Sequence, residues 1–586
     1  MDWLNDLNDA QRRAATARDG PLLIIAGPGT GKTKTLTSRI GYLLGSGRAR
    51  PDEILALTFT NKAAQEMQHR VAGLPGLQKQ PDILTFHGLC RRLLSQHGTT
   101  LSFIDEHERL LLIKQLRLAG ELKTVTSREL ALLLSKLKNL PPDRPVKEDS
   151  LHKLLAAYNQ ELERRGLYDY DDLLQKAYSQ LKQNQPSLPY THILVDEFQD
   201  TNPLQYELLQ LLRTNDSLCV IGDPHQSIYG FRGASSGMFD RFKADFPAHQ
   251  KVELTINYRS AAAVVTLANQ LYPASVQLVA HVKNQGRAAS VHVLNEYSEA
   301  AWVISRIEQA IGGSDFTRSH QWGYGDSGES RTFRDFAILY RTHRVGRTIR
   351  RALAEHGIPF QIIGDGSPYE QPDMWLLMQL LCYAIQPSRE RQAKLESLLT
   401  DLSVAQKRVV LKNLGKKTIL NISDLAADMA RQFDIASSVL NSLLSTLVRF
   451  DKRALADFVA YVDALEGNDF YEPAADAVTL LTIHSAKGLE FTHVFLIATE
   501  EEILPHKNAD TNEEKRLFYV AATRARENLD ILHATTRSGQ PALISQFVAD
   551  LPAGILPRLQ DEMLASDQRR LQKRSAKRRQ GTLFDL

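Results

Sequence analysis

The stretch LLIIAGPGTGKTKTLT, from Leu22 to Thr37, decides which fold this chain takes. An apolar run typical of a buried strand ends in a loop with three glycines, and Lys32 and Thr33 then open a helical stretch. The residues from Ala26 onward fit the phosphate-binding pattern G-x-x-x-x-G-K-[ST], except that alanine stands at its first position. Backbone N–H groups of such a loop and the N-terminus of the following helix hold phosphate oxygens. The stretch therefore predicts a nucleotide site at the end of a strand.

The side chains of this loop predict how the nucleotide is held. Lys32 is expected to reach the β- and γ-phosphates, and the Thr33 hydroxyl is expected to bind Mg²⁺. A chance glycine-rich turn is the alternative, but a strand before, a helix after and a second motif downstream argue against it. The predicted nucleotide-binding residues of the loop are Ala26, Gly27, Pro28, Gly29, Thr30, Gly31, Lys32 and Thr33.

A second motif, ILVDEFQDTN, begins at Ile193 and places an acidic pair after another apolar strand. Asp196 suits a ligand of Mg²⁺, bound directly or through water, and Glu197 suits the base that orients and deprotonates an attacking water. Such a pair alone could be a solvated turn. With a phosphate-binding loop upstream, it predicts nucleotide hydrolysis.

Three further residues favour a motor over the other classes of P-loop protein. Gln226 in IGDPHQSIYGFRGA lies just beyond a strand and can sense a γ-phosphate. Arg259 in NYRS and Arg524 in YVAATRARE belong to the second α/β half of the protein. An arginine that reaches a nucleotide from another domain stabilises charge on the transferring phosphoryl group. Hydrolysis between two domains would change how they close.

Composition places few limits on the binding partner. The 586 residues exceed one ordinary domain, and 43% hydrophobic residues suffice for packed cores. The net charge of +3 does not indicate a nucleic-acid-binding protein, so any basic surface must be local.

The three cysteines are widely spaced, and Cys219 lies in an apolar strand, which predicts a buried thiol. Neither a signal peptide nor an apolar run of membrane-spanning length is evident, which predicts a cytoplasmic protein.

The order of apolar and helical stretches predicts an α/β fold. PLLIIAG, ILALTFT, HILVDE and LCVIGD indicate parallel strands with helices between them. A second set of strands, ASVHVL, DFAILYRT, PFQII, VTLLTIHS and HVFLIAT, predicts a second α/β domain. A mostly helical stretch interrupts each set, one after Leu89 and one after Ser367.

Taken together, these motifs resemble the UvrD/Rep/PcrA family of superfamily 1 DNA helicases. The resemblance runs in order over nearly the whole chain, through LNDAQRRAA, AGPGTGKT, LALTFTNKAAQEM, TFHGLC, YDYDDLL, VDEFQDTN, GDPHQSIYGFRGA, NYRS, ILYRT, TIHSAKGLEF and LFYVAATRARE. It implies that Gln11 reads the adenine and that Tyr258 stacks on it. It implies that Lys487 and Glu490 couple the nucleotide to DNA, and Glu490 is counted among the nucleotide-binding residues.

The family fold consists of two RecA-like motor domains with parallel sheets, 1A and 2A, each interrupted by a mostly helical insertion, 1B or 2B. The resemblance implies domain 1A at 1–88 and 168–253, insertion 1B at 89–167, domain 2A at 254–366 and 476–550, insertion 2B at 367–475, and a basic flexible tail at 551–586. The segment for 2B is shorter than in full-size members, which puts duplex engagement in doubt. His343 stands where the family commonly has asparagine.

Aromatic and polar residues in the remaining motifs are expected to hold a single strand. Aromatic rings bind bases without reading sequence, and each stack contributes about 1–3 kcal/mol. An isolated Phe59 or Tyr229 is more often a core residue, and the resemblance favours the DNA-binding role. The predicted DNA-binding residues are Phe59, Asn61, His87, Tyr229, Phe231, Arg232, Arg341 and His484.

Three functions compete at this point. The resemblance favours an ATP-dependent 3′→5′ helicase that uses Mg²⁺, binds single-stranded DNA and single–double-strand junctions, and acts in repair or replication. A translocase that clears proteins from single strands with little unwinding is the second, and an inactive nucleotide- or DNA-binding scaffold is the third. The C-terminal QGTLFDL also resembles a sliding-clamp peptide, with Gln580, Leu583 and Phe584 as its contacts.

Overall fold

The computed structural model of the protein divides into two compact units, which are described separately: residues 1–327 with 486–586, and residues 328–485. The described residues are 4–73, 79–96, 102–104, 106–119, 122, 124–142, 149–184, 188–215, 217–230, 233, 237–312, 331–363, 372–388, 391–392, 395–396, 399, 406–407, 411–412, 414, 422–433, 435, 439–440, 443–444, 459 and 474–560.

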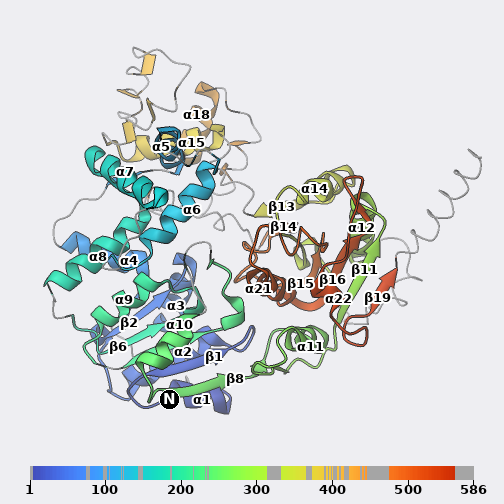
Figure 1. Ribbon diagram of the computed structural model, residues 1–586, viewed down its shortest axis with the longest axis horizontal. Coiled ribbons are helices and arrows are strands. Elements are labelled where there is room, and N and C mark those ends of the chain that lie inside the picture. Colours follow the sequence, from blue (N-terminus) through green and yellow to red (C-terminus); the bar gives the residue numbers. More distant parts are fainter. Residues whose placement is uncertain are drawn as a thin grey trace, which may run out of the picture. The chain divides into compact units, whose positions relative to one another are not determined.

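The first unit contains a six-stranded parallel sheet in the order β3-β2-β6-β7-β1-β8 (Figure 1). Its strands are β1 (Leu22–Ala26), β2 (Ile54–Thr58), β3 (Asp82–Thr85), β6 (His192–Val195), β7 (Leu218–Gly222) and β8 (Gln250–Leu254). The central strands are apolar on both sides because helices cover both faces of the sheet. Cys219 is buried in β7, as predicted.

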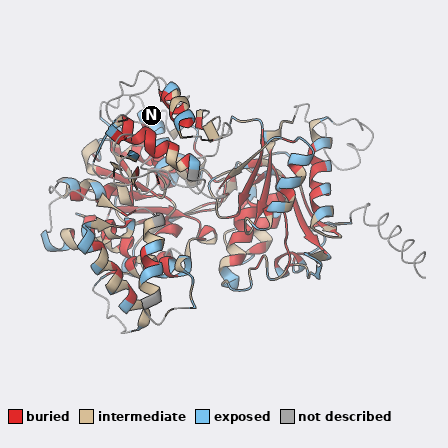
Figure 2. Cartoon of the chain, turned by 90° about the horizontal axis from the view of Figure 1, so that it is seen from above, coloured by how far each residue is buried: buried red, intermediate tan, exposed pale blue. Residues whose placement is uncertain are grey.

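Successive residues of β1 supply the two cores. Leu23 packs in a core with α4 (Phe86–Gln96), α8 (Tyr170–Asn184), α9 (Pro203–Leu212) and α10 (Gly237–Asp245). Leu22 and Ile24 pack on the opposite face with α1 (Asp9–Ala15), α2 (Lys32–Gly45) and α3 (Asn61–Ala72). This alternation follows the two-residue period of a strand. Figure 2 shows the buried strands between helices whose outer faces are exposed.

A helical insertion follows α4 and has a core of its own. Its helices are α5 (Glu106–Ala119), α6 (Ser127–Lys138) and α7 (Ser150–Arg165), and β4 (Ser102–Phe103) pairs with β5 (Leu167–Tyr168) where the chain leaves and re-enters. Thr126 and Glu129 form a capping box at the start of α6. The helical stretch that the sequence predicts between the strands of the first sheet is therefore present.

The first unit also carries the parallel strands β15 (Phe491–Leu496), β16 (Ala525–Ala534), β11 (Arg287–Val293) and β19 (Arg558–Gln560), paired in that order. Its helices here are α11 (Ala262–Leu271), α12 (Glu296–Ile311), α21 (Thr511–Ala522) and α22 (Gln546–Ala549). Two short ladders, β9 (Ile256–Asn257) with β10 (Val279–Ala280) and β17 (Thr536–Arg537) with β18 (Gln540–Pro541), complete it. We call this part the second lobe, and the six-stranded sheet with its helices the first lobe.

The second unit has the parallel strands β13 (Phe360–Ile363), β14 (Val478–Thr482) and β12 (Phe336–Tyr340), paired in that order. Helix α14 (Gly346–Glu355) lies between β12 and β13, while α15 (Pro372–Ile385) and α18 (Ile422–Gln432) share a separate apolar core. All nine predicted strand stretches are therefore strands. Together the two units give the predicted α/β class with parallel sheets.

One feature differs from the expectations. Residues 551–560, which the sequence places in the tail, include the buried Leu551 and Leu556 and strand β19, which pairs with β11. The remaining boundaries between domain segments stay predictions. Within the described ranges, no helix combines the length and the apolar character needed to cross a bilayer.

A buried ion cluster fastens the helical insertion to the first lobe. Lys138, at the end of α6, is fully buried, and its ammonium lies 2.9 Å from Asp169 and 2.7 Å from Asp172 at the start of α8. The Tyr158 hydroxyl of α7 donates to Asp169 at 3.0 Å. Burial acts to raise the pKa of Asp169, but Lys138 outweighs it and holds this pKa below its ordinary value.

We predict that Lys138→Ala loosens the junction between the insertion and the first lobe. Removing one partner of a buried ion pair costs about 3–5 kcal/mol, so local opening should make amides of α6 and α8 exchange about 10²- to 10⁴-fold faster. Hydrogen-exchange mass spectrometry measures this. Lys153→Ala, which removes an exposed lysine of α7, is the control. Equal protection in the two variants would contradict the assignment.

Candidate nucleotide site

The phosphate-binding loop joins β1 to α2 as predicted, and its backbone requires glycine. Gly29 has φ +69° and Gly31 has φ +81°. A Cβ on Gly29 would lie 2.6 Å from the Arg259 Cβ, and one on Gly31 would lie 2.7 Å from the Gln11 Nε2. Gly31 caps α2 without any side-chain hydrogen bond to the first N–H groups. The loop thus offers backbone donors and a helix N-terminus, which fit a polyphosphate.

The residues predicted to read the base lie beside this loop. Gln11 is buried, donates to the Thr30 carbonyl at 2.9 Å and forms a capping box with Asn8 at the start of α1. Asn8 also donates to the Tyr258 hydroxyl at 2.8 Å, and the Tyr258 amide donates to the Gly29 carbonyl. Tyr258 is 40% exposed, and its ring also contacts His281 with centres 4.7 Å apart. The structure therefore brings Gln11 and Tyr258 to the same loop.

The acidic pair follows β6, two strands from β1 in the sheet. Lys32 Nζ lies 4.0 Å from the Glu197 carboxylate. Glu197 has φ +49°, a left-handed conformation that a residue with a side chain adopts only when its surroundings impose it. Its amide donates to the Asp196 carboxylate at 2.8 Å. This turn holds two neighbouring carboxylates at one edge of the sheet.

Their environments push the pKa values of the two carboxyl groups apart. Burial, and then the charge of Glu197, raise the pKa of Asp196 to about 7. Burial also acts to raise the pKa of Glu197, but Lys32, Lys487 and a hydrogen bond from Gln199 outweigh it and lower this pKa. Two carboxyl groups with separated pKa values suit two different chemical roles.

A hydrogen-bond chain connects the ends of β6 and β7. The Gln199 amide group donates to the Glu197 carboxylate, while its carbonyl oxygen accepts from the Asp223 amide at 3.0 Å. Asp223 in turn accepts from Gln226 Nε2 at 2.8 Å. Gln226 is buried. The predicted γ-phosphate sensor is thus tied to the predicted base through Gln199 and Asp223, neither of which sequence reasoning singled out.

Both predicted arginines lie in or next to the second lobe. Arg259 forms an ion pair with Glu490. The carboxylate that was predicted to bind the nucleotide therefore contacts an arginine in this structure. Arg524 is buried and donates to the carbonyls of Val520 and Leu489 at 3.0 Å. Burial, with the charge of Arg259, lowers the pKa of Arg524 to about 9, and the charge of Glu197 acts to raise it. Arg524 therefore remains charged at neutral pH.

Lys487 links the acidic loop to a pair of stacked aromatic rings. Its ammonium lies 2.6 Å from both oxygens of buried Asp200 and donates to the Gln226 carbonyl at 2.7 Å. It also lies 4.9 Å from the centre of the Tyr229 ring. The Phe59 ring stacks on Tyr229 with centres 5.0 Å apart and planes 17° apart. Burial raises the pKa of Asp200 to about 7 against the pull of Lys487.

The other predicted DNA-binding residues are spread over both units. His87, in the first turn of α4, lies 6.2 Å edge-on from the exposed Tyr170, which stacks on Phe103 at 5.4 Å. Asn61 begins α3 and is exposed. The motif YDYDDLL could have drawn attention to Tyr170, which the sequence analysis missed.

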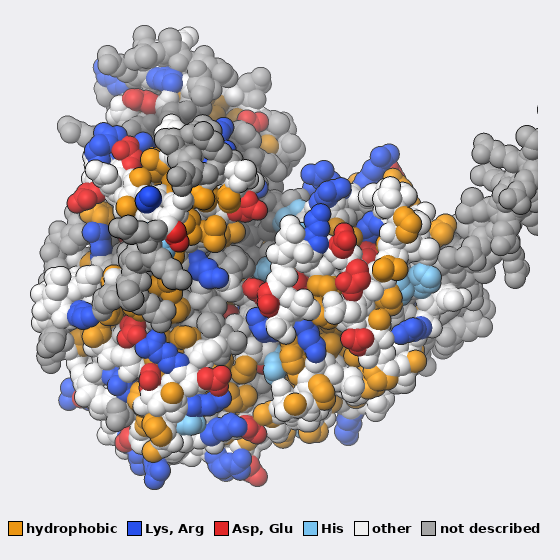
Figure 3. All heavy atoms as spheres, viewed as in Figure 1, with side chains coloured by type: hydrophobic (Ala, Val, Ile, Leu, Met, Phe, Trp, Pro, Cys, Tyr) orange, Lys and Arg blue, Asp and Glu red, His pale blue; other side chains and the backbone are white. Residues whose placement is uncertain are grey.

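In the second unit, Arg341 follows β12 and His484 lies two residues beyond β14. These strands are neighbours, and the Ile483 amide donates to the Tyr340 carbonyl at 3.0 Å. Phe231, Arg232, Gln580, Leu583 and Phe584 lie outside the described residues. On the described part of the face in Figure 3, Lys and Arg alternate with Asp and Glu, which agrees with the small net charge.

The parallel sheet, the glycine loop before α2 and the acidic turn after β6 define a protein of the P-loop class with RecA-like motor architecture. A model of the UvrD/REP helicase N-terminal domain matches residues 7–247, and one of the UvrD-like helicase C-terminal domain matches residues 252–434 and 436–536. The chain therefore belongs to the UvrD/REP helicase family.

Relatives match over most of their length. DNA helicase II of Escherichia coli is 30% identical over 94% of this chain and 88% of its own. ATP-dependent DNA helicase PcrA of Staphylococcus aureus is 29% identical over 94% of this chain and 87% of its own. The alignment with the first runs over 649 positions, more than the 586 residues here, so that relative has segments that this chain lacks.

Proposed function

We propose that this protein is an ATP-dependent 3′→5′ DNA helicase and single-strand translocase that acts in DNA repair or replication. The contacts of Lys487 carry the proposal: one ammonium group joins Asp200, beside the acidic pair, to the Tyr229 ring that stacks on Phe59. A change at the phosphate-binding edge therefore has a short route to an aromatic pair. Family membership and the names of the relatives support DNA as the substrate.

At the nucleotide, each side chain is assigned one task. Lys32 binds phosphate oxygens, and Thr33 and Asp196 hold Mg²⁺, which neutralises charge on the phosphates when bound. Among the described residues no group of three metal-binding side chains occurs. This agrees with a cation that takes further ligands from phosphates and water. Glu197, kept ionised by Lys32 and Lys487, accepts the proton of the attacking water.

Residues from both lobes complete the site. Gln226 senses the γ-phosphate, and hydrogen bonds through Asp223 and Gln199 connect it to Glu197. Arg259 and Arg524 stabilise negative charge on the transferring phosphoryl group. Gln11 reads the adenine edge, and Tyr258 stacks on its face. We assign Glu490 the task of holding Arg259 in position, because the two form an ion pair.

On the DNA side, Phe59 and Tyr229 form the central stacking pair. Their rings contact each other in this structure, so a base that binds between them must separate them, and each new stack contributes about 1–3 kcal/mol. Asn61, His87, Phe231, Arg232, Arg341 and His484 are proposed to line the remaining path. Tyr170 joins them because its exposed ring stands beside His87.

The strongest alternative is a translocase that clears proteins from single strands with little unwinding. DNA helicase II has segments that this chain lacks, because the alignment with it is longer than this chain. This favours the alternative, since a shortened insertion 2B would weaken engagement of the duplex. An inactive scaffold is the third candidate, and the intact polar set around Lys32 and Glu197 argues against it. We propose that the protein is cytoplasmic. Its proposed substrates are junctions between single-stranded and double-stranded DNA.

Strand displacement on 3′-tailed, 5′-tailed and blunt duplexes tests the proposal. We predict ATP-dependent unwinding of the 3′-tailed duplex only, and single-strand translocation at a rate that follows ATP turnover. Glu197→Gln is the matched control, because it keeps the shape of the side chain and removes the base. Unwinding from a 5′ tail would contradict the polarity, and translocation without unwinding would favour the second candidate.

We further propose that the C-terminal QGTLFDL binds a sliding clamp, with Leu583 and Phe584 as apolar anchors and Gln580 at the rim. Titration of the tail peptide against the clamp of the host should show binding that depends weakly on salt. The double substitution Leu583→Ala/Phe584→Ala should abolish it. A contact of the basic run with DNA phosphates would instead weaken steeply with salt and ignore the double substitution. No binding at high micromolar clamp would exclude the proposal.

A further inference from the structure

One aromatic side chain of the first lobe contacts two rings of the second lobe. His225 lies in the short 3₁₀ helix Pro224–Gln226, directly after β7. Its ring stacks on Tyr272 with centres 3.8 Å apart and planes 19° apart, and Tyr519 meets it edge-on at 5.9 Å. Tyr272 ends α11, and Tyr519 lies in α21. The two tyrosines also contact each other, with centres 5.4 Å apart.

A hydrogen bond holds the imidazole, and Asp223 connects the backbone of His225 to the residue that follows. A ring nitrogen of His225 lies 2.6 Å from the Ser275 hydroxyl, and the His225 amide donates to Asp223 at 3.0 Å. The second oxygen of Asp223 accepts from the Gln226 amide group at 2.8 Å and from the Tyr519 hydroxyl at 3.4 Å. Asp223 thus holds both His225 and Gln226, so a displacement of one reaches the other.

The charges around His225 favour a neutral ring. Burial lowers its pKa, the charges of Arg516 and Lys515 on α21 lower it further, and Asp223 acts to raise it. A neutral imidazole can lie flat on Tyr272 without the cost of burying a charge. Two more contacts brace the same loop against α21: Arg516 donates to the Ser227 carbonyl at 2.6 Å, and the Gly230 amide donates to Glu513 at 3.1 Å.

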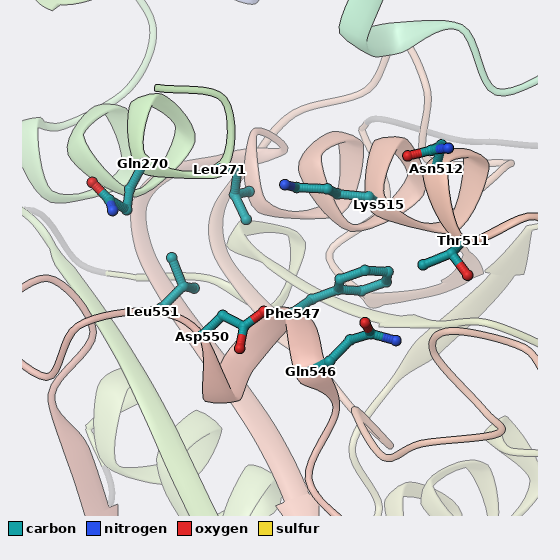
Figure 4. Close-up of a pocket in the computed structure, with 9 residues that line it drawn as sticks. All are labelled: Gln270, Leu271, Thr511, Asn512, Lys515, Gln546, Phe547, Asp550 and Leu551. Carbon is teal, nitrogen blue, oxygen red and sulfur yellow. The ribbon is translucent and has the colours of Figure 1, made fainter. Parts of the chain in front are cut away.

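The second-lobe side of this contact borders a cavity of about 260 Å³ between α11, α21 and α22 (Figure 4). Leu271, the neighbour of Tyr272, lines it together with Phe547 and Lys515. The Lys515 ammonium also lies 5.1 Å from the centre of the Tyr272 ring. The end of α11 therefore borders open space beside Leu271 rather than a filled interior.

We propose that His225 is a positioning residue that sets the place of Gln226 according to how the second lobe sits against the first. The aromatic contact with Tyr272 and Tyr519 transmits the position of the second lobe, and Asp223 passes it to Gln226. The inference rests on the proposed function, in which Gln226 senses the γ-phosphate. The same contacts could be inert packing, and the two accounts differ in their kinetic consequences.

Steady-state ATPase with and without single-stranded DNA, together with thermal unfolding, separates these accounts. His225→Ala should lower kcat of the DNA-stimulated reaction by about 10- to 100-fold, because a misplacement of about 1 Å at a reacting centre can cost about 10²-fold. The KM for ATP should stay within about twofold, because none of the side chains that contact the His225 ring is assigned to phosphate binding. His225→Phe, which keeps a flat ring on Tyr272, should recover most of kcat. His356→Ala, at an exposed histidine of the second unit, is the control.

A double-mutant cycle distinguishes failure of this inference from failure of the proposed function. Gln226→Ala alone should abolish DNA stimulation, and His225→Ala added to it should lower kcat no further, because coupled residues are not additive. If Gln226→Ala leaves kcat unchanged, the proposed role of Gln226 is wrong. If Gln226→Ala is inactive and His225→Ala keeps normal kcat and stimulation, or if the two losses add, His225 is only packing. His225→Leu replaces His225→Ala in the cycle should the alanine variant unfold.

Discussion

The carboxyl ends of three neighbouring parallel strands, β6, β7 and β1, meet at one edge of the first sheet, and the rest of the site depends on this edge. In such sheets ligands bind outside the carboxyl ends of the strands. The edge brings Lys32 within 4.0 Å of Glu197 and places Gln226 after the strand between them. A shift of one strand by one residue would turn its apolar side chains to the other face of the sheet. The burial of these side chains therefore fixes the strand register, and the register keeps the polar residues at the strand ends together.

Buried charge is the second constraint, because each charged group at this edge needs a partner. Asp200 is buried and has Lys487, Arg259 has Glu490, and Glu197 has Lys32 and Gln199. For the buried Asp200–Lys487 pair, removing one partner costs about 3–5 kcal/mol. The Asp200–Lys487 pair joins the first lobe to the segment just before β15 of the second lobe, so a ligand that draws either partner away also alters how the lobes are held. This gives nucleotide binding a physical means to act on Tyr229 and Phe59.

The sequence was sufficient for four strands of the first sheet and for the phosphate-binding loop, but not for β3 and β8 at the two ends of the sheet. The four strands and the loop produce local patterns: β1, β2, β6 and β7 are apolar runs, and the loop needs glycine where φ is positive. Strand β16 was not predicted from the sequence, because Arg526, Glu527 and Asp530 interrupt its apolar pattern. Asp530 is tolerated in the core only because Arg287 and His493 bond to it, and both lie far away in the sequence.

The candidate site divides in the same way. Lys32, Glu197 and Gln226 stand in recognisable motifs, whereas the linking roles of Gln199 and Asp223 depend on contacts across strands. The pairing of Glu490 with Arg259 and the stack of His225 on Tyr272 join segments that no local pattern connects. Tertiary contacts of this kind become visible only in the folded chain.

The central claim is that residues of the second lobe complete a nucleotide site built on the first. ATP turnover by Arg524→Ala, measured beside ATP affinity and thermal unfolding, tests it most directly. Arg526→Ala is the control, because Arg526 is exposed two residues away. The account predicts that the folded Arg524→Ala variant binds ATP with near-normal affinity while kcat falls by about 10³- to 10⁵-fold, the contribution of an arginine finger. Equal turnover in the two variants would contradict it.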